Sequence, residues 1–454
     1  MRASGHVKKI RIAVVGSGIA GLSAAWLLSQ RHDVTVLEAD ARLGGHAHTV
    51  MVKSESGLIP VDTGFIVCNS WTYPNFMALM DYLGVAMTRT AMSFSVSADQ
   101  GRYEYSGDHF GTLLGTARQL ASPSHWRMIA DLVRFYRTAE SKAPHMPEGM
   151  TLGEFLHREG YGRTFMYRHI LPMAGAIWSS TPDEVAAYPL RAFVRFFANH
   201  KLFELGNRPD WCTVTGGSGE YVKRLAADAR FTVRLSTPVQ RIRRHAAGAD
   251  VYLPGGMTET FDAVVIASHG DQALRLLADP TPEERALLSP FRTSVNRVLL
   301  HRDATLMPRT RRFWSAWNYR GDDAGHDQRL SVTYWMNALQ KLPTGTQHFV
   351  SLNPQVRPAA DLVDGSWTYH HPLFNADTLA AQKELWSLQG VKRTWYCGAW
   401  FGAGFHEDGA QAGLAVAEQL GGLPRPWRLE NPSARIHVRN VVAQPLPPLA
   451  IAAE

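Results

Sequence analysis

Residues 10–21 read IRIAVVGSGIAG, and this stretch decides the fold of the chain. Its opening run, IRIAVV, is short, apolar and rich in β-branched side chains, which is typical of a strand buried on both faces. The G-x-G-x-x-G motif that follows supplies three glycines. Gly16 allows a tight turn, Gly18 lets a pyrophosphate approach the backbone, and Gly21 lets strand and helix pack closely. The stretch therefore predicts a Rossmann-type unit that binds a dinucleotide.

The segment after the glycines completes this unit. Residues 22–30 favour a helix and residues 34–37 a second strand, which ends at Glu38. This acid lies 22 residues after Gly16 (38 − 16), where a carboxylate can accept hydrogen bonds from both ribose hydroxyls. The helix N-terminus presents free N–H groups and a positive dipole end to the phosphates. The residues expected to contact the dinucleotide here are Gly16, Ser17, Gly18, Ile19, Ala20, Gly21, Glu38 and Ala39.

A second glycine pair lies close behind the acid. Residues 38–45 form the pattern E-(x)3-R-x-G-G, which resembles that of FAD enzymes of the amine-oxidase and phytoene-desaturase type. The resemblance implies that Arg42 and the paired glycines wrap the pyrophosphate and ribityl chain, and that a downstream D-x-G at residues 62–64 lies near the flavin. It therefore implies FAD as the cofactor. The residues it adds to the site are Arg42, Leu43, Gly44, Gly45, His46, Thr63, Gly64 and Phe65.

Two later segments resemble further parts of the same FAD site. Residues 231–243 and 261–268 favour strands separated by a Pro-Gly-Gly turn, and the resemblance implies contacts of Val239 with the adenine and of the strand end with the cofactor. Residues 395–419 favour a strand, a loop and a helix opened by Gly409. In the family, amides of that helix stabilise negative charge on the reduced flavin. These segments add Val239, Ala267, Ser268, Gly398, Ala399, Asp408, Gly409 and Ala410.

The resemblance also implies the domain organisation. It is an amine-oxidase-like α/β fold, in which a discontinuous Rossmann-type FAD-binding domain alternates with a substrate domain of mixed helices and antiparallel sheet. The expected ranges are 8–70, 212–290 and 388–425 for the FAD-binding domain, 71–211 and 291–387 for the substrate domain, and 426–454 for a C-terminal tail. Residues 313–353 alternate polar and apolar side chains, which favours antiparallel sheet. The resemblance implies that this sheet forms the floor of the substrate cavity.

Composition excludes several classes of protein. The chain has 454 residues, of which 45% are hydrophobic and 19% charged, so it is globular and large enough for two or three domains. Its three cysteines show no C-x-x-C spacing, which argues against a disulfide scaffold or zinc module and for a reduced, cytoplasmic location. The histidines are scattered, so no metal site is expected. No apolar run of membrane-spanning length is present.

The net charge of +7 is unevenly distributed. Arginines cluster in residues 230–244 and 292–320, which indicates either a solvated basic face or a surface for anionic lipid at the inner face of the membrane. No nucleic-acid module is recognisable, so no nucleic-acid partner is expected. Residues 125–136 and 189–203 carry aromatic and basic side chains at helical spacing. They are interpreted either as helices lying at a membrane interface or as core helices with snorkelling basic residues.

A more specific resemblance concerns the substrate. The motifs that carry it are GGHAHT at 44–49, DTGFIVCN at 62–69, TYPNF at 72–76, LPMAGAIWS at 171–179 and GFHEDG at 404–409. They resemble a bacterial branch of oxidoreductases found beside cyclopropane-fatty-acid-synthase-like methyltransferases. That resemblance implies an unsaturated, methyl-branched acyl chain of phospholipid as substrate, desaturation toward furan fatty acids, and a lipid methyltransferase as partner. Where typical amine oxidases carry a Gly-Thr-Glu type motif, this chain has Gly398-Ala399-Trp400.

Desaturation in such enzymes transfers a hydride to flavin N5 and requires a base for the neighbouring proton. The candidate catalytic residues are His406, Glu407 and Asp408, followed by His46 and His48, although Asp408 would also suit a helix cap. Candidate substrate contacts are Asn69, Tyr73 and Trp178; the first two would equally suit a turn before Pro74. The alternatives are an amine oxidase, a carotenoid or porphyrinogen desaturase, and a non-catalytic lipid-binding flavoprotein that partners a methyltransferase.

Overall fold

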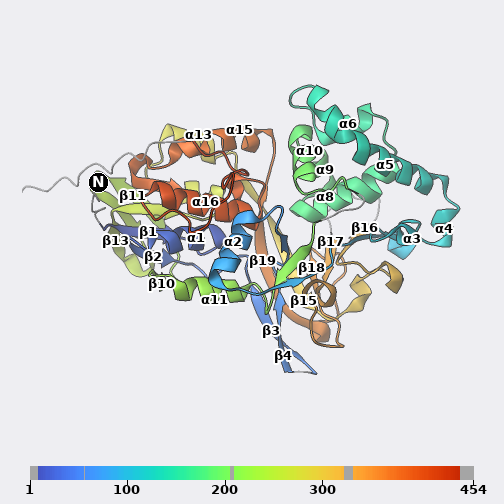
Figure 1. Cartoon of the computed structure of the whole chain (residues 1–454), viewed down its shortest axis with the longest axis horizontal. Coiled ribbons are helices and arrows are strands. Elements are labelled where there is room, and N and C mark those ends of the chain that lie inside the picture. Colours follow the sequence, from blue (N-terminus) through green and yellow to red (C-terminus); the bar gives the residue numbers. More distant parts are fainter. Residues whose placement is uncertain (1–8, 56, 205–208, 322–330, 440–454) are drawn as a thin grey trace, which may run out of the picture.

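The computed structural model describes residues 9–55, 57–204, 209–321 and 331–439. Figure 1 shows two lobes joined by long strands, one around β1, α1 and α16 and the other around α5, α6, α8 and α10. The chain enters the first lobe three times, because strands from three distant stretches pair in one sheet. This sheet therefore combines strands from residues 11–37, 232–266 and 394–396.

The first lobe contains a five-stranded sheet in the order β10-β2-β1-β14-β20, in which every pair is parallel. Its strands are β1 (Arg11–Val15), β2 (Asp33–Leu37), β10 (Thr232–Arg234), β14 (Ala263–Ile266) and β20 (Thr394–Tyr396). Strands β1 and β14 are almost wholly buried, because α1 packs on β1 and the strands β12 (Gly248–Tyr252) and β13 (Thr258–Phe261) contact β14 and β1. This sheet is the predicted α/β Rossmann-type core.

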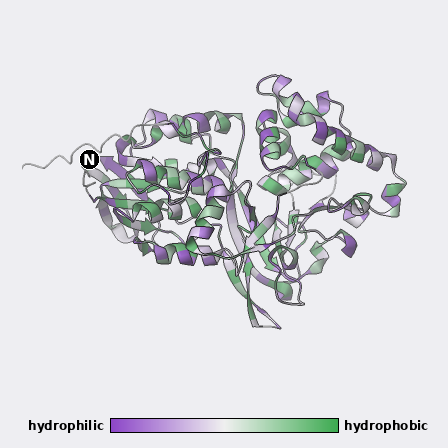
Figure 2. Cartoon of the chain, viewed as in Figure 1, coloured by the Kyte–Doolittle hydropathy of each residue, from purple (hydrophilic) through white to green (hydrophobic). Residues whose placement is uncertain are grey.

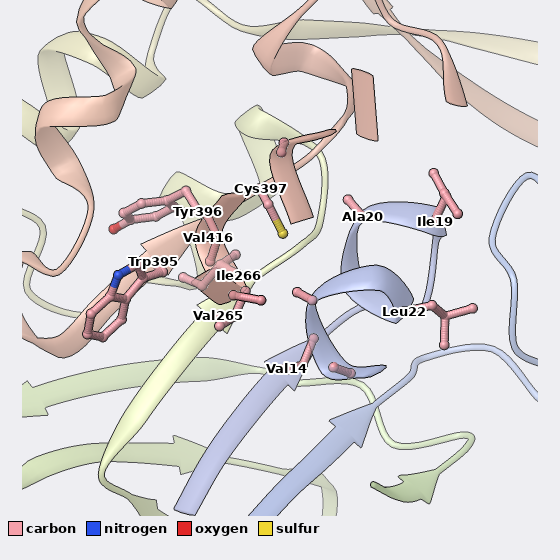
Figure 3. Close-up of a cluster of buried hydrophobic side chains, with 14 of the residues drawn as sticks. Val14, Ile19, Ala20, Leu22, Val265, Ile266, Trp395, Tyr396, Cys397 and Val416 are labelled. Carbon is pink, nitrogen blue, oxygen red and sulfur yellow. The ribbon is translucent and has the colours of Figure 1, made fainter. Parts of the chain in front are cut away.

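Two helices pack closely against each other beside this sheet. In α1 (Ile19–Leu28) every residue is buried, and α16 (His406–Gln419) lies against it. A Cβ on Gly413 would lie 2.1 Å from the carbonyl oxygen of Ala20, so only glycine permits the approach of the two backbones. Figure 3 shows the buried side chains that join the helices to the sheet, among them Val14, Val265 and Val416.

The structure corrects several element boundaries. The first helix begins at Ile19, inside the glycine motif, and α16 begins at His406, ahead of Gly409. The strand expected over residues 231–243 is divided into β10 and β11 (Arg241–His245), and residues 258–266 form β13 (Thr258–Phe261) and β14. The chain leaves the sheet after β10 because Ser236 adopts a left-handed conformation (φ 49°) and Pro238 has no N–H to donate. Strands β11, β12 (Gly248–Tyr252) and β13 form a separate antiparallel sheet.

The sheet of the second lobe has seven strands in the order β19-β15-β18-β17-β16-β7-β8. These are β7 (Phe94–Ala98), β8 (Tyr103–Ser106), β15 (Arg292–His301), β16 (Trp317–Gly321), β17 (Ser331–Trp335), β18 (Phe349–Leu352) and β19 (Val363–Leu373). The antiparallel pairing expected for residues 313–353 is present in β16, β17 and β18. Strands β7 and β8 were not expected, and β7 pairs with β16 in parallel.

A layer of helices covers this sheet. Its main members are α5 (Pro123–Lys142), α6 (Leu152–Arg158), α8 (Leu171–Trp178), α9 (Pro182–Ala186) and α10 (Leu190–Asn199). Phe193 and Phe197 of α10 are buried and stack on each other at 4.2 Å, and Phe135 of α5 is also buried. Purple and green alternate along these helices in Figure 2, as expected of amphipathic helices packed on a core. The aromatic face of α10 is therefore core, which corrects its interpretation as a membrane-interface helix.

The remaining elements are short or lie at the junction of the lobes. The helices among them are α2 (Pro74–Leu83), α3 (Phe110–Leu113), α4 (Ala117–Leu120), α7 (Arg163–Phe165), α11 (Gly219–Asp228), α12 (Gly270–Leu276), α13 (Pro282–Leu288), α14 (Met336–Gln340) and α15 (Ala376–Glu384). The strands are β3 (Thr49–Ser54), β4 (Gly57–Asp62), β5 (Cys68–Asn69), β6 (Met87–Arg89) and β9 (Trp211–Val214). In the described ranges no helix combines the length and apolar character needed to cross a membrane.

The described part of the tail packs on the first lobe. Trp427 stacks on Trp26 at 6.1 Å, and Arg425 forms an ion pair with Glu418 of α16. Arg435 reaches the carboxylate of Asp408 at 2.6 Å. These contacts make residues 425–436 a strap across α16 and α2. The rest of the predicted tail, from residue 440, lies outside the described residues.

Candidate active site

One cavity of about 1140 Å³ extends from the carboxyl ends of the parallel strands to the seven-stranded sheet. Its lining runs from Val15 and Leu37, at the ends of β1 and β2, to Trp317 and Tyr369 of β16 and β19. Open parallel sheets bind ligands in the crevice outside the carboxyl ends of their strands. The cavity exceeds the roughly 300–1,000 Å³ of pockets for drug-sized ligands, so it suits a ligand of dinucleotide size.

The cofactor end is built around the start of α1. This helix has no side-chain cap and no acid in its first turn, so its first N–H groups are left for an anionic ligand. Gly16 has φ +100°, the left-handed conformation that the tight turn requires. A Cβ on Gly18 would meet no protein atom within 4 Å, so the space in front of this backbone is open. The geometry matches a pyrophosphate site.

Glu38 is held in place at the end of β2. Its Oε2 accepts hydrogen bonds from the N–H of Ser17 at 2.8 Å and from the Ser17 hydroxyl at 2.5 Å. Its Oε1 accepts the N–H of Asp40 at 2.9 Å. The carboxylate still lines the cavity, so it has a fixed orientation toward a ribose bound there.

The loop that carries Gly44 and Gly45 lies against the loop that carries Gly16 and Gly18. A Cβ on Gly45 would lie 3.0 Å from the Cα of Gly18, so the two loops approach each other backbone to backbone. Arg42 donates to the carbonyl oxygen of Gly45 at 2.8 Å and to that of Ala47 at 3.3 Å. Its guanidinium therefore organises the loop around the glycines as well as lining the cavity.

Most of the predicted cofactor residues meet at this cavity. Those that line it are Gly16, Ser17, Gly18, Ile19, Ala20, Glu38, Ala39, Arg42, Gly45, His46, Gly64, Phe65, Val239, Ala267, Ser268, Gly398 and Ala399. Those that do not are Gly21, Leu43, Gly44, Thr63, Asp408, Gly409 and Ala410. Gly21 and Gly409 serve close packing: a Cβ on Gly21 would lie 2.0 Å from the Gly16 carbonyl oxygen, and one on Gly409 2.8 Å from Ile19.

The substrate end is aromatic and aliphatic. Its lining includes Ile66, Val67, Tyr73, Ile177, Trp178, Trp317, Tyr334, Trp367 and Phe374. Tyr73 and Trp178 are therefore placed as predicted. Asn69 is not, because its side chain is buried and accepts the N–H of Thr72 at 2.8 Å, which makes it the turn residue of the alternative interpretation. The carboxylates among the described lining residues, Glu38 and Asp40, both belong to the cofactor end.

Histidines supply most of the polar groups of the substrate end. Those lining the cavity are His46, His48, His269, His370, His371 and His406. Burial lowers the pKa of His406 to about 3 and is the largest cause that lowers the pKa of His371 to about 4. Burial likewise lowers the pKa of His48 to about 4. The imidazoles of His406, His371 and His48 are therefore neutral at pH 7.

Contacts fix the orientation of two of these imidazoles. The ring of His406 stacks on Phe65 with centroids 3.7 Å apart, and its Nε2 lies 2.9 Å from the hydroxyl of Tyr221. His371 is held through Asn296, whose Nδ2 donates to His371 Nδ1 at 3.3 Å. This bond leaves the proton of the neutral ring on Nε2. The HH pair at 370–371 is visible in the sequence, but only the pairing of β19 with β15 brings it beside Asn296.

Two of the predicted catalytic residues face the protein interior. Glu407 is fully buried and accepts the N–H groups of Asn75 (3.0 Å) and Phe76 (2.9 Å) at the start of α2. Asp408 is fully buried, accepts the N–H of Phe405 at 2.8 Å and pairs with Arg435. Neither lines the cavity. They cap helices and anchor the strap, because α16 begins at His406 and turns both carboxylates away from the ligand space.

Comparisons with known proteins agree with this site. The family model described as flavin containing amine oxidoreductase matches residues 19–420. A protein of Mycobacterium tuberculosis, AofH, provisionally named a flavin-containing monoamine oxidase, is 25% identical over 336 residues, which are 72% of this chain and 70% of that protein. The chain therefore belongs to the flavin containing amine oxidoreductase family. It is a flavin-dependent oxidoreductase with FAD as its cofactor.

Solved structures share the fold. The CLA-producing fatty acid isomerase from P. acnes aligns with a TM-score of 0.61 and 16% identity, over 90% of this chain and 98% of that one. Cyclohexylamine oxidase from Brevibacterium oxydans IH-35A aligns with a TM-score of 0.63 and 15% identity, over 91% and 100%. At such identities these likenesses establish the amine-oxidase-like fold and nothing about the substrate.

Proposed function

We propose that this enzyme desaturates an unsaturated, methyl-branched acyl chain of a membrane phospholipid, or shifts a double bond in it. The observation that carries the proposal is the substrate end of the cavity, where aromatic and aliphatic side chains surround neutral imidazoles. An acyl chain gains free energy from such a surface, since apolar burial contributes roughly 25 cal/mol per Å². The fatty acid isomerase of the same fold is a precedent for an acyl substrate in this architecture.

An amine substrate is the second candidate, favoured by the oxidases of the same family. An ammonium group would lose its hydration on entering the cavity, and a buried charge needs an opposite charge or several hydrogen bonds. The described lining offers no carboxylate at the substrate end. Phe65 and His406 stack on each other with centroids 3.7 Å apart, so these two rings leave no room for an amine between them. These features favour the acyl chain.

In the proposed reaction one carbon loses a hydride and its neighbour a proton, and a double bond forms between them. FAD, when bound, supplies the acceptor for the hydride. The chain's own residues hold the acyl tail against Tyr73 and Trp178 and exclude water. A cavity imidazole takes the proton, and His406 is the residue we propose for this step, since it is neutral and lines the cavity. A methyltransferase acting on an unsaturated chain would supply the branched substrate.

Anaerobic flavin reduction tests the proposal. The holoenzyme is mixed with a methyl-branched, unsaturated phospholipid dispersed in neutral detergent, and in parallel with cyclohexylamine and putrescine. We expect the visible absorption band of oxidised flavin to bleach with the lipid and to persist with the amines. Bleaching by an amine alone would replace the proposal with amine oxidation.

A matched pair of variants sharpens the result. Ile177 lines the substrate end and is partly exposed to the cavity, so it tolerates a polar side chain. Ile177→Asp places a carboxylate there, and Ile177→Asn places a neutral group of nearly the same shape. We expect the aspartate to slow reduction by lipid at least about tenfold more than the asparagine does, since a charge costs more to desolvate against an acyl chain. Equal effects of the two variants would contradict an apolar substrate at this position.

A further inference from the structure

The second lobe ends in a surface built from two separate stretches of the chain, residues 110–127 and 309–312. We define the distal patch as Phe110, Arg118, Leu120, Trp126, Arg127, Arg309, Arg311 and Arg312, which come from α3, α4, the start of α5 and the loop before β16. Figure 1 places α3 and α4 at the edge of the molecule farthest from β11. The patch is therefore remote from the FAD-binding lobe.

Contacts through one residue join the segments. Glu104 in β8 is fully buried, and its carboxylate accepts the N–H of Arg309 at 2.6 Å. Its carbonyl oxygen accepts the side-chain N–H of Gln119 in α4 at 2.7 Å. Arg312 in turn donates to the carbonyl oxygen of Gly115 at 2.9 Å. The arginine loop and the helix that carries Leu120 are thus held side by side.

Large apolar side chains project from this surface. Phe110 is 68% exposed, and Leu120 and Trp126 are each 45% exposed. The indole N–H of Trp126 donates to the backbone carbonyl oxygen of Leu120 at 2.9 Å, so the Trp126 ring is held against the end of α4. A cluster of exposed aromatic and aliphatic side chains in a soluble lobe marks an interaction site, because water contact with them is unfavourable.

The charge around these side chains has one sign. All five arginines of the patch are exposed, whereas the exposed acid in the described residues 108–127 and 309–312 is Asp108. Asp131, near Arg127, is buried and also pairs with Arg134. In the other arginine-rich stretch Arg244 is buried against Glu284 and Arg234 pairs with Glu259, while Arg241 and Arg243 remain exposed. Among the described residues the distal patch therefore combines exposed positive charge with large apolar side chains, and of its arginines Arg127 has an ion-pair partner.

We propose that the distal patch docks the enzyme on an anionic lipid bilayer. Phe110, Leu120 and Trp126 would enter the interfacial region, where aromatic side chains are favoured, and the arginines would pair with lipid phosphates. A single-stranded nucleic acid could stack its bases on the aromatic side chains, but it would not bury the projecting aliphatic side chain of Leu120. This inference concerns where the enzyme binds and is independent of the reaction it catalyses.

Vesicle co-sedimentation tests the patch directly and needs no turnover. The holoenzyme is incubated with vesicles of phosphatidylglycerol and phosphatidylcholine, or of phosphatidylcholine alone. We expect binding to the anionic vesicles that weakens as salt is raised. Removing arginines by R309Q/R311Q/R312Q should weaken binding about a hundredfold, at about fivefold for each charge near a membrane surface.

Two controls decide the interpretation. R241Q/R243Q removes two exposed arginines from β11, at the opposite end of the molecule, and should leave binding within twofold. Brominated acyl chains should quench part of the tryptophan fluorescence of the bound enzyme. Trp126→Phe should abolish that part, while flavin content and visible spectrum stay unchanged. Equal loss in both arginine variants, or binding to single-stranded DNA that matches binding to vesicles, would overturn the proposal. Retained binding by the triple variant would overturn it as well.

Discussion

The two ends of the cavity are built in different ways. At the cofactor end the contacts are mainly backbone groups and glycines from residues 16–45, supported by one carboxylate that is adjacent in the same unit. At the substrate end they are side chains from segments as far apart as Tyr73, Trp178 and Tyr369. Backbone conformation depends on nearby residues, so the cofactor end is encoded locally. The substrate end exists only after the second lobe has packed.

The largest effect is expected from a methyl group at the cofactor end. In Gly21→Ala the new Cβ would lie 2.0 Å from the backbone oxygen of Gly16, a contact that no side-chain rotation relieves. We expect the free energy of unfolding to fall by about 1–3 kcal/mol or more, the usual cost of overpacking, and bound flavin to be lost. Thermal unfolding and the ratio of flavin to protein absorbance measure both.

Gly18→Ala is the matched control for that change. Its Cβ would meet no protein atom within 4 Å, so the unfolding temperature of the apoprotein should stay within about 2 °C of wild type. FAD affinity should nevertheless fall, because the methyl group enters the space reserved for the pyrophosphate. Normal flavin binding by Gly18→Ala would show that this space is not the phosphate site.

A smaller effect is expected when Glu38, at the cofactor end of the cavity, loses its charge. Glu38→Gln removes the charge that orients Ser17 and faces the ribose. Hydrogen bonds to charged groups contribute about 1.5–3 kcal/mol, so the FAD dissociation constant should rise roughly ten- to a hundredfold. Titration of apoprotein with FAD measures it, with the exposed Glu140→Gln as control. An unchanged constant would remove Glu38 from the site.

Glu407→Gln sharpens the boundary between catalytic and structural acids. The carboxylate accepts N–H groups of α2, and an amide can satisfy only part of them. We expect a loss of about 1–3 kcal/mol in the free energy of unfolding, with the pH dependence of flavin reduction unchanged. Urea unfolding and anaerobic stopped-flow separate the two. Full stability with abolished reduction would restore Glu407 as the base.

The smallest expected effect concerns the pH dependence of stability that the histidines of the substrate end cause. Burial lowers the pKa of His406 to about 3 and that of His371 to about 4, against 6.5 in the unfolded chain. Between pH 6.5 and 4 the unfolded chain therefore binds more protons than the folded chain, and stability falls as the pH falls. Each such histidine contributes a slope approaching about 1.4 kcal/mol per pH unit.

His406→Gln should reduce that slope by up to one histidine's share, since it removes one titrating group and retains a partner for Tyr221. His145→Gln, at an exposed position, should leave the slope unchanged. Urea unfolding at pH 7.5, 6.0 and 5.0 is the measurement. A slope that is the same in all three proteins would mean that His406 is already protonated in the folded enzyme.

The part of the cofactor site formed by residues 16–45 could be predicted in detail because its residues follow one another along the chain. Gly16, Gly18, Glu38 and Gly45 line the cavity as expected. The errors arose where a boundary shifted by a few residues. Because α16 begins at His406 rather than at Gly409, Glu407 points into the protein and caps α2, while Asp408 takes its alternative role as the cap of α16. His269 and His371 were missed for another reason, since nothing near them in the sequence marks a cavity.

The sequence by itself determined the dinucleotide-binding unit, the family and the FAD cofactor. Glycine spacing, strand patterning and an acid at a set distance act through local conformation, which the chain carries before it folds. Only the tertiary structure decided which aromatics are core and which are exposed, as with buried Phe197 and projecting Trp126. It also decided which histidines line the cavity and which arginines are exposed beside apolar side chains. These properties depend on the residues that packing brings together from distant segments. The sequence of one segment is compatible with more than one set of such contacts.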